Sequence, residues 1–398
     1  MKSLDQALSV LLGSIAPVTQ TESVSLQQAL GRVIAVPVTS PIDVPAHDNS
    51  QMDGYVGVAV EMNNATEPMV VSQRIPAGHP GTALAPGTVA RIFTGAPIPS
   101  GANAVIMQEQ VQVLDDGRIK LLEPVSPGQN IRPRAGDIAC GAMMLEKGRR
   151  LSAADIALCA SVGQSQLTVF RRLKVAVFSS GDELRQPGQS LGSGQIYDSN
   201  RPMIMGLAQG LGVEVVDMGC LPDDLAVTRA RLGEAAQCSD VILTCGGVSV
   251  GEEDHIKAAI SALGSLDLWK ISVKPGKPFA FGRVGQAFFM GMPGNPVAAW
   301  VTFALLVRPS LIAMMGALPN PPLGFRVQAG FEWSKPDSRQ EFLRAWIDAQ
   351  GRAQIHDRQN SAVLSSVTQC NGLVEIPAST PVLTGEFVRF IPYTEIVN

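Results

Sequence analysis

Glycines and carboxylates follow a short apolar run in the stretch Asp240–Asp254. The run Val241–Leu243 predicts a buried strand, and a helix-like stretch begins at His255. Glycines such as Gly246 and Gly247 let backbone N–H groups approach an anion, and a helix N-terminus favours negative charge. The carboxylates that end the stretch would repel a bare phosphate. We therefore expect a divalent cation to bridge carboxylate and phosphate here.

Two further loops carry groups that suit a metal–phosphate ligand. Three ammonium groups, those of Lys270, Lys274 and Lys277, lie within eight residues, among prolines and a glycine that restrict the backbone. The second loop follows the apolar run 287–290 and precedes a long apolar helix predicted over 297–307. It consists of Met292, Pro293, Gly294, Asn295 and Pro296.

The elements that must position these loops begin at Lys174. Strands predicted at 175–178, 213–216 and 241–243 alternate with helices, which indicates βαβ units and a parallel sheet. Ligands of such sheets bind at the carboxyl ends of the strands. Glu183, Asp223, the Gly246–Gly247 pair and Asp254 all fall at those ends. Each carboxylate alone is better explained as a helix N-cap, but together, beside a glycine loop, they favour a site.

The regions on either side of this α/β pattern differ from it in composition. Prolines, glycines and short Val/Ile runs over 41–141 predict β structure with many turns, so Asp53 and Thr94 are explained by turn chemistry alone. A solvated turn with a local ion pair explains Asp137. Residues 319–322 resemble a linker, and 323–398 predict a small β-barrel. There, two arginines near a serine, Arg339 and Arg344 with Ser361, suit either an oxyanion contact or surface charge.

The first 40 residues predict two short helices. Ser3 with Gln6 and Ser25 with Gln28 both fit the capping box, in which two side chains satisfy free N–H groups at a helix start. The leucines of the first helix form an apolar stripe that indicates packing.

The length and composition restrict the classes of protein to which this chain can belong. A chain of 398 residues predicts two to four domains. Charged residues are 17% and the net charge is −4, which argues against a nucleic-acid binder. Six scattered cysteines with no CxxC pair argue against zinc and indicate a reducing compartment. No signal peptide is evident, and no apolar run reaches membrane-spanning length, so we expect a cytoplasmic protein without membrane contact.

Eight motifs occur in order along the chain: NSQMDGY (49–55), RIFTGAPIPSGANAVIMQE (91–109), IRPRAGDI (131–138), SSGDEL (179–184), YDSN (197–200), TCGGVSVGEED (244–254), VKPGKPFAFG (273–282) and GMPGNPVAAW (291–300). Through these motifs the chain resembles the MoeA-type molybdopterin molybdenumtransferases, the family of the gephyrin E domain, over essentially its whole length. Cys245 departs from the family's usual Thr or Ser, and the barrel motif RQNS departs from its Gln-Gly-Ser.

The resemblance implies a multi-domain α/β and β protein. It places an N-terminal region at 1–170 with a β-rich inserted domain at about 45–140. An α/β molybdopterin-binding domain with a mostly parallel sheet follows at 171–315, and a C-terminal β-barrel at 320–398. It also implies a homodimer whose active site lies between the α/β domain of one subunit and the barrel of the other.

The implied reaction inserts molybdate into adenylylated molybdopterin and releases AMP with Mg²⁺. Asp254, with Glu183 or Asp223, is expected to hold the metal, and Lys274, Lys277 and Arg344 the molybdate. An upstream adenylyltransferase and downstream cofactor-handling proteins are implied partners. A scaffold protein or a tungstate-using paralogue remains an alternative. The implied catalytic residues are Asp53, Thr94, Asp137, Glu183, Asp223, Asp254, Lys270, Lys274 and Lys277, and the expected substrate contacts are Gly246, Gly247, Ser249, Pro293, Gly294, Asn295, Pro296, Arg344 and Ser361.

Overall fold

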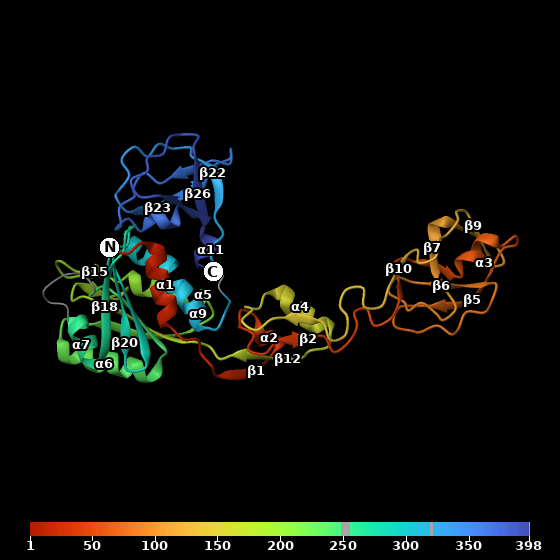
Figure 1. Ribbon diagram of the computed structural model, residues 1–398, viewed down its shortest axis with the longest axis horizontal. Coiled ribbons are helices and arrows are strands. Elements are labelled where there is room, and N and C mark those ends of the chain that lie inside the picture. The colour runs from red at the N-terminus through yellow and green to blue at the C-terminus, as the bar shows by residue number, and fades with distance from the viewer. Residues whose placement is uncertain (248–254, 319–320, 398) are drawn as a thin grey trace.

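The computed structural model describes residues 1–247, 255–318 and 321–397 as an elongated molecule (Figure 1). An α/β domain and a C-terminal domain lie together at one end, with both chain termini, and a small β-rich domain lies at the other. A narrow segment containing β1 (Thr21–Ser25) and β12 (Gln166–Phe170) joins the two ends. Two predicted site residues, Ser249 and Asp254, lie outside the described residues.

The α/β domain is built on a six-stranded sheet with the order β16-β13-β17-β21-β20-β18. The first four strands run parallel, and β20 and β18 pair antiparallel at one edge. The predicted mostly parallel sheet is therefore confirmed. Its strands are β13 (Lys174–Ser180), β16 (Glu214–Leu221), β17 (Val241–Cys245), β18 (Gly264–Lys270), β20 (Pro278–Val284) and β21 (Ala287–Met292).

Helices cover both faces of this sheet. Alternate side chains of β13 point to opposite faces, so Val175 and Val177 pack beneath α5 (Asn200–Gly210). Ala176 and Phe178 pack beneath α6 (Leu225–Cys238) and α7 (His255–Leu263). Because both faces are covered, the strand reads as an unbroken apolar run in the sequence.

One long helical run forms much of the core beneath the pocket described below. It comprises α8 (Pro296–Thr302), a π-helical turn (Phe303–Val307) and α9 (Arg308–Met314). The run has 19 residues and a mean hydropathy of 1.8, so by length and composition it could cross a membrane, contrary to the sequence prediction. Because 89% of it is buried inside the protein, it is a core helix.

The C-terminal domain contains a sheet with the order β19-β23-β25-β26-β22, and β24 pairs with β23. The α/β domain supplies β19 (Val273–Lys274), which runs parallel to β23 with Lys274 opposite Glu341. The described pairings follow an open path, so closure into a barrel stays a prediction. The other elements are β22 (Phe325–Gln328), β23 (Gln340–Ile347), β24 (Ala353–Ile355), α10 (Ser365–Thr368), β25 (Gly372–Ile376), β26 (Phe387–Pro392) and α11 (Tyr393–Val397).

The α/β and C-terminal domains share one hydrophobic core. Phe342 and Ile391 of the C-terminal domain belong to the same buried cluster as Trp300 of α8. The rings of Trp300 and Tyr393 lie 4.6 Å apart. The first helix, α1 (Leu4–Ser14), also packs into this cluster.

The predicted capping box at the start of α1 is formed. The Ser3 hydroxyl accepts from the Gln6 N–H, and the Gln6 side chain accepts from the Ser3 N–H. The second predicted box is wrong, because α2 (Leu26–Ala29) has no side-chain cap hydrogen bond. The Ser25 hydroxyl instead donates to the Gln28 side chain at 3.3 Å.

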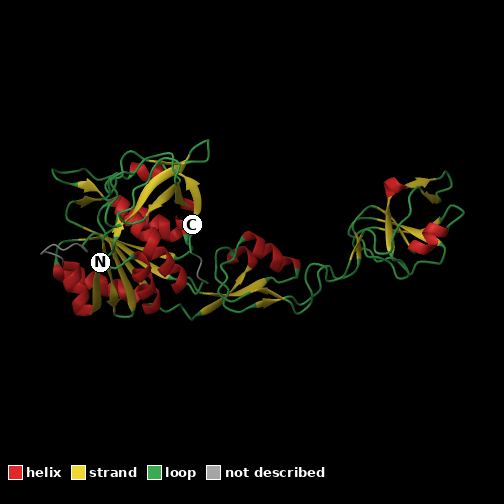
Figure 2. Ribbon diagram, turned by 45° about the horizontal axis from the view of Figure 1, so that its top comes forward, coloured by secondary structure: helices red, strands yellow, loops and turns green. Residues whose placement is uncertain are grey.

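The β-rich domain, called the arm domain here (residues 45–140), has its own cores. Its central sheet has the order β5-β6-β4-β7, and its buried clusters contain arm residues alone. Figure 2 shows it separated from the other domains by the narrow segment. The elements of arm and segment are β2 (Val38–Thr39), β3 (Asn49–Ser50), β4 (Gly54–Gly57), α3 (Ala59–Asn64), β5 (Val70–Ile75), β6 (Thr88–Ile92), β7 (Ala104–Met107), β8 (Val111–Val113), β9 (Ile119–Leu121), β10 (Ile131–Arg132), β11 (Met143–Leu145) and α4 (Ala153–Ser161).

Candidate active site

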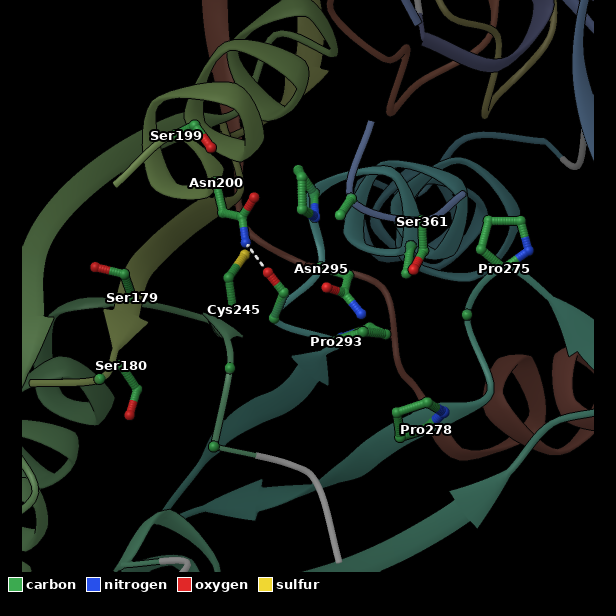
Figure 3. Close-up of a pocket in the computed structure, with 18 of the residues that line it drawn as sticks. Ser179, Ser180, Ser199, Asn200, Cys245, Pro275, Pro278, Pro293, Asn295 and Ser361 are labelled. Carbon is green, nitrogen blue, oxygen red and sulfur yellow. Dashed lines mark hydrogen bonds between the residues drawn. The ribbon is translucent and has the colours of Figure 1, made fainter. Parts of the chain in front are cut away.

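A pocket of about 940 Å³ lies at the carboxyl ends of the parallel strands β13, β17 and β21. This is the edge where ligands bind in open α/β sheets. Its walls come from the α/β domain and from two loops of the C-terminal domain in the same chain (Figure 3). Arg339 and the loop Gln359–Ala362 of the same chain line the pocket, and the expected contribution from the C-terminal domain of a second subunit stays a prediction.

Glycines directly after β17 allow the backbone to form the floor of the pocket. Gly246 and Gly247 have φ values of +92° and +65°, which side chains disfavour. A Cβ on Gly246 would lie 2.8 Å from the Ser180 carbonyl oxygen, and a Cβ on Gly247 would lie 2.3 Å from Ile256 Cδ1. Both positions therefore require glycine.

Besides Asp198, which pairs with Arg201, two carboxylates line the same pocket. Glu183 folds over Gly181, where a Cβ would lie 2.2 Å from Glu183 Oε2. Asp223 is held in its loop by its N–H, which donates to Asp182 Oδ1 at 3.2 Å. Among the described residues there is no group of three His, Cys, Asp or Glu side chains that could hold a metal. Two carboxylates nevertheless fit Mg²⁺, which is bound through one or two carboxylates together with substrate phosphates and water.

Two helix starts face the pocket. Asn200, the first residue of α5, donates from Nδ2 to the Gly294 carbonyl at 2.6 Å, as the dashed line in Figure 3 marks. Asn295 is the N-cap of α8 but makes no side-chain cap bond, and the Val297 N–H donates to the Ser361 carbonyl at 2.9 Å. The C-terminal domain thus satisfies one N–H of α8, while the positive ends of both helices favour an anion.

The cations of the pocket are Lys274, Lys277 and Arg339. The Lys274 ammonium lies 3.0 Å from Glu341 Oε1 and 3.4 Å from Asp337 Oδ2. Arg339 donates to both oxygens of Asp337, at 2.9 and 3.0 Å, and this guanidinium holds the pKa of the Asp337 carboxyl well below its ordinary value. The C-terminal domain therefore supplies both a cation and the partners of Lys274.

Most of the residues predicted for the α/β site are brought together. Those that line this one pocket are Glu183, Asp223, Gly246, Gly247, Lys274, Lys277, Pro293, Gly294, Asn295, Pro296 and Ser361.

Two predicted residues near the pocket do not line it. Lys270 ends β18 with an exposed side chain. Arg344 is wholly buried, and burial lowers its pKa to about 10. Its guanidinium donates to the Ser366 hydroxyl and to the carbonyls of Arg358 and Asn360. Arg344 therefore supports the loop that carries Ser361 from behind.

Three predicted residues lie away from the pocket. The Thr94 N–H and hydroxyl both donate to Asp53 Oδ1 at 2.8 Å in the arm domain, and these bonds, the N–H first, lower the pKa of the Asp53 carboxyl. Asp137 is exposed near the end of the arm domain where the chain leaves it, and its N–H donates to the Val44 carbonyl. The arm lies at the opposite end of the elongated molecule from the α/β domain (Figure 1).

Sequence reasoning gave no role to some residues of the pocket. Asn200 belongs to the quoted motif YDSN, and its place at a helix start after a parallel strand is the signal that could have identified it. Asp198 of the same motif is buried and accepts from the Arg201 N–H and guanidinium at 3.1 and 3.0 Å. Arg339 was expected only as one of two arginines near a serine that suit an oxyanion contact or surface charge, and the pairing of β23 with β19 brings it to the pocket.

Three family models match consecutive parts of the chain. The MoeA N-terminal region (domain I and II) matches residues 2–163, and the MoeA C-terminal region (domain IV) matches residues 326–393. Between them, a model described as a probable molybdopterin binding domain matches residues 176–313, which contain the α/β part of the pocket.

Relatives and solved structures match over nearly the whole chain. A molybdopterin molybdenumtransferase of Haemophilus influenzae is 40% identical over all of both chains. Molybdopterin molybdenumtransferase 2 of Mycobacterium tuberculosis is 34% identical and covers 94% of each. A crystal structure of the molybdopterin biosynthesis moeA protein of Pyrococcus horikoshii OT3 superposes with a TM-score of 0.85 at 30% identity, covering 99% of this chain and all of that one.

Proposed function

This chain belongs to the MoeA family, and we propose that it acts as a molybdopterin molybdenumtransferase in molybdenum cofactor biosynthesis. One observation carries the proposal: two glycines, three carboxylates, two helix starts and three cations meet in a single pocket at the carboxyl ends of parallel strands. Such an arrangement suits an extended anionic ligand with a phosphate group and a bound cation.

The substrates are adenylylated molybdopterin and molybdate. The floor at Gly246–Gly247 and the starts of α5 and α8 bind the phosphates through backbone N–H groups. Lys277 is exposed on the pocket wall and binds the molybdate dianion through charge-assisted hydrogen bonds. The dithiolene sulfurs of the pterin then replace oxo groups on molybdenum, and the thiol protons leave with the displaced oxygen as water. Water hydrolyses the phosphoanhydride, so AMP leaves and the other phosphate stays on the pterin.

Glu183 and Asp223 would hold Mg²⁺ at the pyrophosphate, together with Asp254, which lies outside the described residues. When bound, this cation offsets the charge that develops as the phosphoanhydride breaks. The protein's own share is positioning. Asn200 holds the Gly294 carbonyl, and the Ser361 carbonyl holds the start of α8. The loop that leads from Gly294 into α8 therefore presents a fixed geometry to the substrate.

The active molecule is a homodimer. Asp53 and Thr94, whose roles are carried over from the family, lie in the arm domain far from the pocket of their own chain. A second copy can bring its arm to that pocket, whereas the C-terminal domain, for which we expect a barrel, is already supplied in cis. We place the protein in the cytoplasm, between an adenylyltransferase that makes its substrate and proteins that handle its product.

The test is AMP release from adenylylated molybdopterin by the purified protein, with molybdate and Mg²⁺ each present or omitted. We expect AMP only when both are present. Tight binding of the pterin without AMP release would support a scaffold protein instead. Parallel assays with tungstate in place of molybdate separate the tungstate-using paralogue, which would turn over faster with tungstate.

A further inference from the structure

A wholly buried carboxylate lies behind the cations of the pocket. The Glu341 side chain on β23 has no exposed surface. Its Oε2 accepts hydrogen bonds from Trp333 Nε1 and from the Asp337 N–H, both at 2.8 Å. Its Oε1 makes no hydrogen bond of good geometry among the described residues but lies 3.0 Å from the Lys274 ammonium. Lys274 is therefore the cation that compensates this buried charge.

The pairing of strands enforces this contact. Lys274 and Glu341 stand opposite each other where β19 of the α/β domain joins the C-terminal sheet. Two more hydrogen bonds tie the same junction, because the Gln340 N–H donates to the Ser272 carbonyl and Arg339 Nη1 donates to the Val273 carbonyl. The loop that follows Lys274 carries Lys277 and forms one wall of the pocket.

Charge at the junction is balanced. Lys274 and Arg339 carry two positive charges, and Asp337 and Glu341 carry two negative charges within ion-pair distance. Within the described residues, Lys277 lines the same pocket with no ion pair of its own. The ammonium that is free to meet an anion is thus that of Lys277, whereas the charge of Lys274 is already compensated.

We propose that Glu341 is a positioning residue of this pocket, which fixes the Lys274 ammonium at the domain junction so that the loop presents Lys277 to the anionic substrate. This inference rests on the proposed function. A buried ion pair contributes little net stability compared with apolar residues of the same volume, because both ions lose their hydration. The pair instead defines one geometry for a loop that starts in one domain and is anchored in another.

The first test needs no substrate. Lys274→Met leaves the Glu341 carboxylate buried without its counter-charge, so we expect the midpoint of thermal unfolding to fall by about 5 °C or more. Adding Glu341→Gln removes the uncompensated charge while its amide oxygen keeps the bonds from Trp333 and Asp337. The unfolding midpoint of the double variant should recover at least about half of the decrease caused by Lys274→Met. A lower midpoint in the double variant than in Lys274→Met alone would contradict the assignment of Lys274 as the counter-charge of Glu341.

The second test measures AMP release at varied molybdate concentration. Glu341→Gln should lower kcat about 10²-fold, the scale of a misplaced active-site group. It should also raise the KM for molybdate, because the loop then holds Lys277 away from the anion; a KM equal to that of the wild type would contradict the proposal. In a Lys274→Met background, which is itself impaired, Glu341→Gln should add less than about threefold. Two independent effects would instead multiply, and that result would contradict action through Lys274.

The matched control is Glu375→Gln on β25 of the same sheet. Glu375 accepts from Gln340 and pairs with Arg389 at 2.7 Å, but it does not line the pocket. Its kcat should stay within about twofold of the wild type; a loss equal to that of Glu341→Gln would reduce the effect to general damage of the sheet and overturn the proposal.

Should Glu341→Gln fail to fold, Asp337→Asn removes the second partner of the same ammonium at a site with 21% side-chain exposure. It should give a smaller kcat loss that is likewise absent in the Lys274→Met background, and an additive loss would count against the proposal. A wild type that releases no AMP under any condition defeats the proposed function, and the unfolding series then decides the role of Glu341 alone.

Discussion

The C-terminal domain and the arm domain are attached to the α/β domain in opposite ways. The C-terminal domain shares a buried cluster with α8, takes up β19 as a strand of its sheet and caps α8 through Ser361. The arm domain has clusters of its own, and its described residues share no buried cluster with the α/β domain. Two extended segments, bridged at Val44 and Ile138, connect it to the rest.

This difference separates two ways of supplying residues to a site. A domain that shares a core presents its side chains at fixed geometry, so Arg339 and Ser361 belong to the pocket of their own chain. A domain on an extended connection can move as a unit, because few contacts cross to its neighbour. The arm can therefore bring Asp53 and Thr94 to the pocket of a second copy, although it holds them away from the pocket of their own chain.

The largest effect is expected at the shared core. Trp300 is 4% exposed and packs against Tyr393, so Trp300→Ala should cost about 3–5 kcal/mol of unfolding free energy. Calorimetry should show the α/β and C-terminal domains shifting together as one transition. Separate unfolding transitions for the two domains would contradict the claim that they unfold as one unit around a shared core.

A similar change in the arm should act only locally. Ile106 is fully buried in an arm cluster, and Ile106→Ala should cost about 2–5 kcal/mol. We expect faster hydrogen exchange throughout the arm sheet β4–β7 and unchanged exchange in β13 and β17. Loss of protection in those α/β strands would show that the arm is coupled to the pocket in the free chain.

The arm's polar pair should matter for turnover rather than folding. Asp53→Asn weakens a half-buried carboxylate held by Thr94, so the free energy of unfolding should change by less than about 0.5 kcal/mol. AMP release should nevertheless fall about 10²-fold if the pair acts at a pocket. Wild-type turnover in this variant would remove the arm from the mechanism.

The smallest effect concerns the junction of β12 with the sheet. Burial alone would raise the pKa of Asp240, but the Arg171 guanidinium and the Lys174 N–H lower it below the ordinary value. A lowered pKa stabilises the fold above the unfolded-state pKa of about 4, and this is lost as pH falls through the folded value. Asp240→Asn should therefore cost about 1 kcal/mol in urea unfolding at pH 7, with the difference shrinking below pH 4. A difference that grows in acid would contradict this sign.

Local sequence patterns predicted much of the α/β site. Strand alternation and the glycines at 246–247 located the edge of the sheet, and the residues placed there do line one pocket. Sequence could not predict that Arg344 is wholly buried, because its burial depends on loop 358–360 folding over it. The roles of Asp53 and Thr94 came from family resemblance, since turn chemistry explains their local pattern equally well.

The pairing across domains was also beyond local reasoning. Lys274 reads as a free cation in the sequence, yet strand pairing places it against Glu341, which lies 67 residues later in the chain. Such contacts follow from how domains dock and leave no periodic signal in either segment.

The most direct test of the account mixes two inactive variants, Asp53→Asn in the arm and Lys277→Ala in the pocket, co-expressed with different tags and purified through both. In a dimer whose arm completes the partner's pocket, each mixed molecule has one intact site and one doubly damaged site. We predict AMP release at about half the wild-type rate per mixed dimer. A mixed dimer no more active than either parent would contradict the claim that the arm serves the pocket of a second copy.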